Sequence, residues 1–417
     1  MGSYRRNHYV PQWFQYRFIS EDQNEKKFFY LDLKPEIKIT SNGKKYSRKS
    51  ILKWGPPRCF YEDDLYTTKF PEFESTEIEE KFFGKIDSEG KDAVEYFSNF
   101  EHPSASREHL FSFLKYASVQ KIRTPKGLEY LRLLTKPRSK NQLLYDMQEF
   151  HQMHCALWSE CLWSIVDASK SSTKFLLSDN PITLYNQDCY PNSRDCRGFN
   201  EPGIWLDGTH TIFPLCLDKA LILTNLSWVR NPYGNPKKRR PNAELFRDSM
   251  FNFTDIQTGR FLSDQEVISI NYVIKNRALR YIAAQKEEWL YPEKYLSVKD
   301  WSKIGTSYLL MPDPRSVSFS SEVIIGYENG VSDAYDEYGR KPWHTDFKEE
   351  KRHLNEWFSF QAFKGEYARI FGSKRRGTSF RFGAIERSED DPEYHALNLS
   401  LESQYKSRIK SWRKRRR

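Results

Sequence analysis

The segment Lys174-Phe-Leu-Leu-Ser-Asp-Asn-Pro-Ile-Thr-Leu-Tyr185 decides how the chain is organised, because the hydrophobic period changes there. Before it, apolar residues recur every three or four positions, which is typical of amphipathic helices. From Phe175 onward, short apolar runs alternate with turn residues, which is typical of strands. Ser178-Asp-Asn-Pro181 is such a turn signal, since Asp and Asn side chains hydrogen-bond nearby backbone and proline disfavours helix at the residue before it.

Three long helical segments are predicted upstream of this change, over 75–100, 107–136 and 140–168. Pro125 interrupts the second segment, because proline is tolerated only in the first turn of a helix. The third has the clearest apolar stripe, formed by Leu143, Met147, Phe150, His154, Leu157, Cys161 and Ile165. Downstream, a capping box at Ser263-Asp-Gln-Glu266 predicts a helix that runs to about Gln285.

Strand-like runs lie on both sides of the long helices. They are 28–33, 36–39, 174–178, 182–185, a pair within 203–226, and then 306–311 and 322–327. Ser41-Asn-Gly43 supplies a tight turn after the second run. Strands, then helices, then strands, without regular βαβ alternation, predict an α+β fold with N-terminal strands, a central cluster of long helices and a mixed or antiparallel sheet.

Length and composition set the class of protein. The 417 residues exceed one typical domain, and we expect a main α+β domain over 1–290, an aromatic α+β extension over 291–392 and a basic amphipathic tail over 393–417. Aromatic residues make up 16% of the chain, which excludes disorder throughout. No apolar run reaches the roughly 18 residues of a membrane span. The start of the chain lacks an export signal, so a cytoplasmic protein is expected.

The basic excess is concentrated at the C-terminus. The formal net charge is +10, and 406–417 contains eight basic residues and no acid, which leaves +2 for the rest. These cations are Lys406, Arg408, Lys410, Arg413, Lys414, Arg415, Arg416 and Arg417. Leu401, Tyr405, Ile409 and Trp412 lie close to one helical face among them. Such a helix suits a nucleic-acid backbone, an anionic membrane surface or an acidic protein partner. Alternatively, it is a solvated tail that keeps the protein soluble.

Metal and cofactor sites are not predicted. The six cysteines form no CxxC pair, and Cys189 and Cys196 are interpreted as free thiols rather than a disulfide or half of a metal site. Glu79 and Asp87 are eight residues apart, about 12 Å along a straight helix, too far to chelate one ion together. His151 and Cys155 have zinc-like spacing, but core packing explains that segment. The sequence contains no nucleotide-loop or dinucleotide-fold signature.

Asn7-His-Tyr-Val-Pro-Gln12, followed by Phe18, resembles the opening signature of a bacterial family known as domain of unknown function 4238. Three later segments resemble that family as well: Val119–Pro125, with its Gln, Arg, Thr and Pro; the turn that ends at Pro181; and Asn271–Ala278. The resemblance covers 8–285 and departs where Glu79 and Asp87 stand in place of two glutamates. It implies no reaction. The variable gene neighbourhoods of the family imply an accessory role, in phage defence or toxin-like, only loosely.

His8 is a candidate acid–base group because its side chain titrates near neutrality. Gln12, four residues on, orients its ring only if this segment is helical, which Pro11 puts in question. Alternatively, His8 packs the N-terminus against the core. Asp179 and Asn180 either form a structural turn or lie where a strand ends, a place where ligands collect in mixed sheets.

Gln120 and Arg123 share a helical face, so the guanidinium either binds an anion or pairs with Glu79 or Asp87. Asn271 is predicted to face inward, as a tether or as part of a polar pocket.

The leading hypothesis is a protein that acts on nucleic acid or a nucleotide. If it is an enzyme, we expect a phosphodiester or glycosidic hydrolase with His8 and Asp179 as catalytic groups. Gln12, Gln120, Arg123, Asn180 and Asn271 are expected to bind substrate. The alternative is a non-enzymatic module that binds nucleic acid or a partner through its basic tail.

Overall fold

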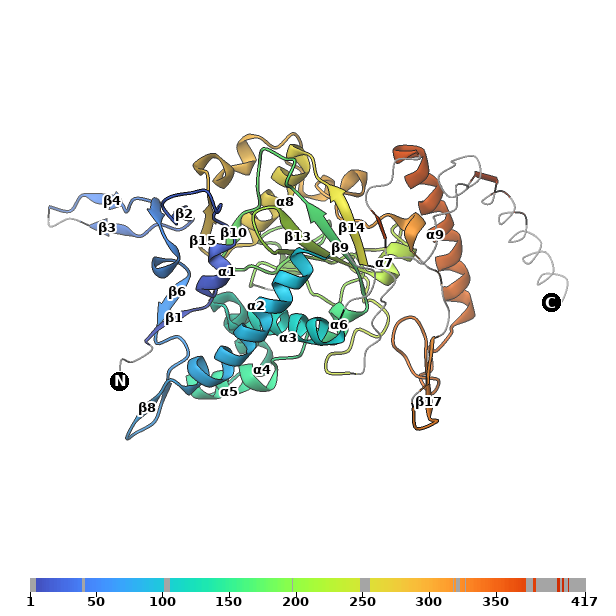
Figure 1. Cartoon of the computed structure of the whole chain (residues 1–417), viewed down its shortest axis with the longest axis horizontal. Coiled ribbons are helices and arrows are strands. Elements are labelled where there is room, and N and C mark those ends of the chain that lie inside the picture. The colour runs from blue at the N-terminus through green and yellow to red at the C-terminus, as the bar shows by residue number, and fades with distance from the viewer. Residues whose placement is uncertain are drawn as a thin grey trace.

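The computed structural model describes residues 5–39, 42–100, 106–196, 198–247, 256–317, 319, 323–326, 328–372, 378–379 and four single positions between 396 and 404. The chain is 39% helix and 19% strand, with mixed and antiparallel sheets and strands at the N-terminus, which confirms the α+β prediction (Figure 1). The predicted basic cations of 406–417, and the face formed by Leu401, Tyr405, Ile409 and Trp412, lie outside the described residues.

A six-stranded mixed sheet forms the centre of the protein, in the order β11-β12-β13-β9-β14-β18. Its strands are β9 (Cys161–Asp167), β11 (Thr183–Tyr185), β12 (His210–Pro214), β13 (Lys219–Asn225), β14 (Ile256–Phe261) and β18 (Thr378–Ser379). Only the β9–β14 pair is parallel among these described strands. Every residue of β9 and β12 is buried, which explains why the largely apolar β9 shows no alternation of polar and apolar residues.

A second, antiparallel sheet has four strands in the order β10-β15-β2-β5. It pairs two strands from the N-terminal region, β2 and β5, with two strands from much later in the chain, β10 and β15. Its strands are β2 (Phe28–Asp32), β5 (Ile51–Trp54), β10 (Leu177–Ser178) and β15 (Tyr281–Ala284). The remaining strands form two-stranded pairs: β1 (Arg6–His8) with β6 (Tyr61–Asp63), β3 (Ile37–Ile39) with β4 (Lys45–Ser47), β7 (Thr68–Lys69) with β8 (Glu74–Ser75), and β16 (Val323–Gly326) with β17 (Ser332–Tyr335).

The helices cover the sheets on several sides (Figure 1). They are α1 (Gln12–Tyr16), α2 (Gly84–Ser98), α3 (Arg107–Arg123), α4 (Pro125–Thr135), α5 (Lys140–Glu149), α6 (Cys155–Ser159), α7 (Leu226–Arg230), α8 (Asp264–Arg277) and α9 (Glu350–Phe371). One π-helical turn, η2 (Ile78–Phe83), leads directly into α2. The predicted break at Pro125 is confirmed: Thr124 caps α4, its side chain accepting a hydrogen bond from the Gly127 amide, and Pro125 occupies the first turn.

Three predicted segments differ from the structure. The helix predicted over 140–168 ends at Glu149, and its last part is strand β9, because a segment buried on both faces has no period that separates helix from strand. The helix predicted to reach about Gln285 ends at Arg277, since Tyr281–Ala284 pairs with β2. Residues 306–308 form a 3-10 turn rather than a strand.

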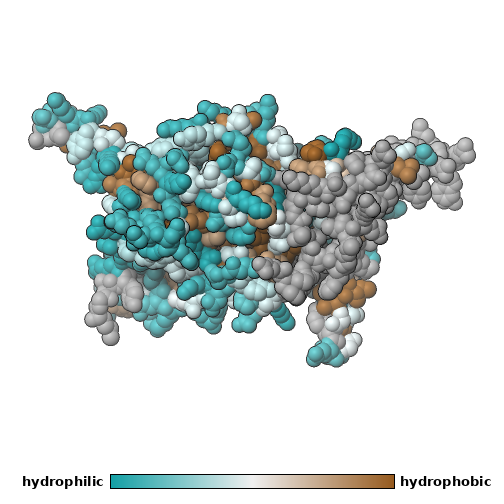
Figure 2. Space-filling model, turned by 45° about the horizontal axis from the view of Figure 1, so that its top comes forward, coloured by the Kyte–Doolittle hydropathy of each residue, from teal (hydrophilic) through white to brown (hydrophobic). Residues whose placement is uncertain are grey.

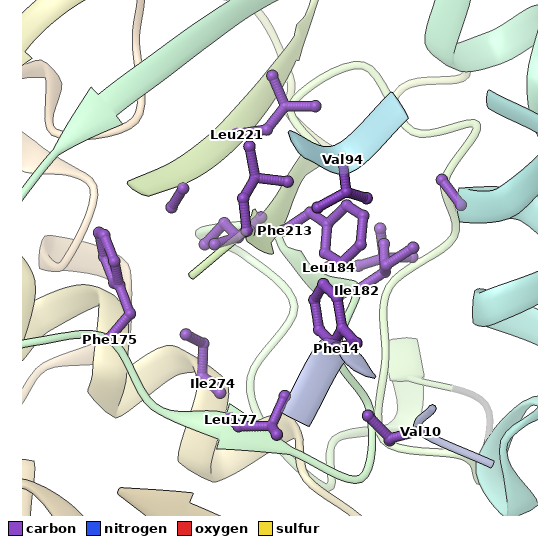
Figure 3. Packing of buried hydrophobic residues seen from close by; sticks show 14 of the residues in the cluster. Val10, Phe14, Val94, Phe175, Leu177, Ile182, Leu184, Phe213, Leu221 and Ile274 are labelled. Carbon is purple, nitrogen blue, oxygen red and sulfur yellow. The ribbon is translucent and has the colours of Figure 1, made fainter. Parts of the chain in front are cut away.

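One hydrophobic core unites distant parts of the chain. Figure 3 shows Phe14 of α1 beside Phe213 of β12, with Val94 of α2 close by, and the two phenylalanine rings stack with centroids 5.5 Å apart. The same core includes Trp301 and Leu310, which follow the expected domain boundary at 290. A smaller core gathers side chains of α7 and α9 around Tyr338. Within the described residues, no helix is both long and apolar enough to cross a membrane.

Candidate functional site

His8 and Gln12 contact each other, although the segment between them is not the helix on which the sequence prediction depended. Pro11 precedes α1 instead of preventing it, and α1 begins at Gln12. His8 is the last residue of β1, and the amide nitrogen of Gln12 lies 3.5 Å from its Nδ1. Burial lowers the pKa of His8, and the positive charge of Arg6 lowers it further, although the carbonyl of Pro57 opposes the shift. The imidazole is consequently neutral at pH 7, the form that can accept a proton.

Gln120 and Arg123 contact each other next to the segment that contains His8. The Gln120 amide donates to the Tyr9 carbonyl at 2.9 Å, and its oxygen accepts a hydrogen bond from Arg123 Nε at 2.8 Å. The guanidinium of Arg123 also lies 2.9 Å from the Asp87 carboxylate. Both side chains are buried. These contacts correspond to the structural alternative for Arg123, an ion pair between packed helices.

Glu79 stands on the π-helical turn next to this ion pair. Burial raises the pKa of Glu79 to about 7, the nearby Asp87 charge adds to the shift, and Arg123 opposes it. Its Oε2 is buried and has no hydrogen-bond partner among the described residues, and the same holds for the Tyr116 hydroxyl. Single π-helical turns are frequent at functional sites. Glu79 is therefore a carboxyl group that can exchange a proton at neutral pH.

Asp179 and Asn271 are both bound to backbone. The carboxylate of Asp179 accepts hydrogen bonds from the amides of Leu279, Arg280 and Tyr281, at 2.6–2.8 Å. These bonds fix the turn between α8 and β15. Asn271 accepts from the Leu176 amide at 3.0 Å and donates to the Lys174 carbonyl at 2.8 Å, which ties α8 to the segment before β10. The catalytic role of Asp179 and the substrate-binding role of Asn271 stay predictions, and these contacts favour the structural alternatives.

Asn180 belongs to a different group of residues, which we call the lysine cluster: Lys121 of α3, Lys126 of α4, Asn180 and Glu201. Lys121 Nζ donates to Asn180 Oδ1 at 3.0 Å, to the Ile182 carbonyl at 2.7 Å and to Glu201 at 2.5 Å. Asn180 also donates to Glu201, at 2.8 Å. All three protons of the Lys121 ammonium are therefore engaged.

Lys126 is the unusual member of the lysine cluster. It is only 3% exposed, and its ammonium donates to the Arg277 carbonyl and, at 3.4 Å, to the Asn200 carbonyl. Burial lowers the pKa of Lys126 to about 8, even though the Glu201 carboxylate opposes the shift. Two carbonyl acceptors leave one of its three protons without an acceptor in these contacts.

The carboxylate and the histidine near Lys126 have fixed charge states. Burial alone raises the pKa of Glu201, but the charges of Lys121 and Lys126 outweigh it and hold that pKa at about 2. Burial lowers the pKa of His154 to about 3, so this ring is neutral. Its Nδ1 is buried and has no hydrogen-bond partner among the described residues.

A cavity opens onto the lysine cluster. Its other lining residues are Gly127, Tyr130, His154, Leu184, Phe199, Pro202, Gly203, Ile204 and Trp205. About 30 Å³ is open to the centres of water-sized molecules, room for roughly two waters or one small polar group. Mostly apolar walls with a few convergent polar groups are typical of small-ligand sites. Two cations, Lys121 and Lys126, line the cavity with one carboxylate, Glu201, which is paired with Lys121, and this excess of positive charge favours an anion.

The sequence interpretation found Asn180 and missed Lys121, Lys126 and Glu201. Lys126 carried a signal that could have found it, because a cation in the first turn of a helix opposes the helix dipole and needs a local reason. Glu201 carried none, since it lies in a loop 80 residues from its partner Lys121. Among the residues that the structure describes, no group of three or more His, Cys, Asp or Glu side chains could hold a metal ion. All six cysteines are free thiols.

No protein-family model, no curated protein and no solved structure matches this chain. The resemblance to the family with the Asn7–Gln12 signature therefore remains a prediction.

Proposed function

We propose that this chain binds a phosphate-bearing ligand, a nucleotide or the end of a nucleic-acid strand, in the cavity of the lysine cluster. The observation that carries the proposal is Lys126, a buried ammonium at the cavity that has two acceptors for its three protons among the residues that the structure describes. A buried cation without a full set of partners is costly. An anionic oxygen that accepts its remaining proton would remove that cost.

The other groups at the cavity support an anion that carries a ring. His154 Nδ1 is a second buried polar atom without a partner among the described residues, and a neutral imidazole can donate to a phosphate oxygen. Tyr130 and Phe199 form an edge-to-face pair in the lining, with centroids 5.1 Å apart. Aromatic faces of this kind stack on nucleobases. The space beside the cluster has room for one small polar group, so we expect only the phosphate to enter it and the base to lie outside it, against Tyr130 and Phe199.

Hydrolysis is an extension of the proposal. Close to its pKa of about 8, Lys126 exchanges a proton at neutral or mildly basic pH, which is the property required of a general base. The proposed reaction class is hydrolysis of a phosphodiester or a glycosidic bond. The non-enzymatic alternative, binding of nucleic acid through the eight cations of 406–417, concerns residues outside those described and is tested separately by truncation.

The test is a binding titration with fluorescent nucleotides and short labelled oligonucleotides. Lys126→Met should weaken nucleotide binding at least tenfold, because the variant keeps an unbranched side chain of similar size and removes the charge. Lys303→Met is the matched control, since Lys303 is 65% exposed and distant in sequence from the cluster. Affinity of the wild type should also fall as pH rises above 8, when Lys126 loses its proton. Equal binding by Lys126→Met and the wild type would refute the proposal.

Binding without turnover would confine the site to recognition. Incubation of each bound nucleotide with the wild type, followed by chromatography of the products, decides this point. Loss of turnover in Lys126→Met at nucleotide concentrations high enough to saturate the weakened site would identify Lys126 as the proton acceptor.

A further inference from the structure

The hairpin of β3 and β4 extends away from the body of the protein on the same side as the N-terminus (Figure 1). All six strand residues are exposed, and Ile37, Ile39 and Tyr46 are 69%, 65% and 50% exposed. In the described part of the chain, these two strands pair only with each other. A lone two-stranded ribbon is marginally stable by itself and contributes little to a core. The hairpin therefore points to a binding partner other than this chain.

The ribbon is strongly basic. Residues 34–49 contain six basic side chains and one acid, whereas the chain without its C-terminal tail is close to neutral. The single acid, Glu36, is already paired with Arg48 at 3.1 Å and approaches Arg280 at 3.9 Å. The remaining cations of the ribbon are Lys34, Lys38, Lys44, Lys45 and Lys49. A local excess of this kind attracts a polyanion.

The register gives the ribbon two different faces. Lys38 lies opposite Tyr46, and Ile39 lies opposite Lys45. Because side chains alternate along a strand and opposite residues share a face, Lys38, Tyr46 and their neighbours Lys44 and Arg48 share one face. Ile37, Ile39, Lys45 and Ser47 share the other. Each face therefore carries cations beside an aromatic or branched apolar side chain.

We infer that the β3–β4 hairpin is a docking element for duplex DNA, inserted into the major groove. The major groove of B-form DNA admits a two-stranded ribbon, and apolar side chains there contact thymine methyl groups. The cations contact the flanking phosphates. Double-stranded RNA has a deep, narrow major groove that side chains cannot read, so DNA is the preferred duplex.

The sequence of the turn argues against a membrane as the occupant. Residues 40–43, between the two strands, are Thr, Ser, Asn and Gly, and binding to a membrane interface depends on buried apolar area, which these residues do not supply. Figure 2 shows the arm at the upper left as mostly hydrophilic. The inference goes beyond the proposed function and does not depend on the lysine cluster, because the hairpin is a separate surface element.

The test measures binding of the full chain to a labelled 20-base-pair DNA across a salt series. Replacement of Lys38, Lys44 and Lys45 by Gln should reduce the log–log salt slope by about 2.7, since each lost phosphate contact contributes ~0.9. The control is the triple replacement of Lys81, Lys85 and Lys91 by Gln, which removes the same charge from exposed positions of η2 and α2. Its slope should stay close to that of the wild type.

Two further measurements distinguish DNA binding by the hairpin from the alternatives. The hairpin variant should keep wild-type nucleotide affinity, and Lys126→Met should keep the DNA salt slope, so the two sites fail independently. A matched RNA duplex should bind more weakly than DNA and lose less of its slope in the hairpin variant. The inference is overturned if the hairpin and control variants have equal DNA slopes, if the RNA duplex binds as well as DNA, or if the hairpin variant loses binding only to anionic vesicles.

Discussion

Replacement of Lys126 by Met tests the electrostatics of the cavity through the stability of the protein. An unfolded lysine titrates at about 10.5, and Lys126 in the folded chain titrates at about 8. Between these values the unfolded chain binds more protons than the folded chain, so the free energy of unfolding rises with pH. Burial of the charged ammonium lowers the free energy of unfolding by its full amount below pH 8, and this loss becomes smaller as pH approaches 10.5.

The size of the effect follows from the shift. A pKa shift of one unit is equivalent to 1.36 kcal/mol, and integration between pH 7 and pH 10 gives a gain of roughly 2.5 kcal/mol for the wild type. Lys126→Met lacks the titrating group. The difference in unfolding free energy between wild type and variant should therefore change by roughly 2–3 kcal/mol over this range, in favour of the wild type at high pH.

Urea unfolding followed by tryptophan fluorescence at pH 7, 8, 9 and 10 measures this difference. Other groups that titrate in the range are the same in both proteins, so their effects cancel. Lys303→Met is the control for the loss of a lysine at an exposed position. If the curve for Lys126→Met runs parallel to that of the wild type at every pH, the ammonium is well solvated, and the argument for an anion site fails.

Three other predictions concern the remaining groups. Glu79→Gln should stabilise the protein above pH 7 and have little effect near pH 4, because the folded chain keeps Glu79 protonated up to about pH 7; equal effects in urea unfolding at both pH values would contradict the raised pKa. Asp179→Ala should destabilise the fold by roughly 3 kcal/mol or more, since three backbone amides lose their acceptor, and a thermal midpoint equal to that of the wild type would show that the turn does not need this carboxylate. Removal of 406–417 should lower the DNA salt slope by up to about 7 if all eight cations contact phosphates; an unchanged slope would mean that the tail does not bind the duplex.

Local signals in the sequence predicted local structure well. The capping box at Ser263 is present, with Glu266 completing it, and the Thr124–Pro125 boundary separates α3 from α4. Both features are decided by hydrogen bonds within a few residues. Strand β9 was wrongly predicted as helix. Both of its faces are buried, so its apolar residues are compatible with a helical period as well as with a strand.

The candidate site was predictable only where its residues share one element. Gln120 and Arg123 were placed on one helical face, and the structure shows their side chains bonded to each other. The lysine cluster depends on contacts over long sequence distances, such as Lys121 with Glu201 and Lys126 with the carbonyl of Arg277. No spacing rule reaches across 80 or 151 residues, so that site became visible only in the folded chain.

The position of β2 has a consequence for synthesis on the ribosome. Phe28–Asp32 is one of the first strands made, and its neighbour on one side, β5, follows within about twenty residues. Its other neighbour, β15, is Tyr281–Ala284. At translation rates of about 5–20 residues per second, this edge waits roughly 12–50 s for its partner. During that time the nascent chain exposes an unpaired strand, and chaperones that bind such edges should associate with it until residue 284 has emerged.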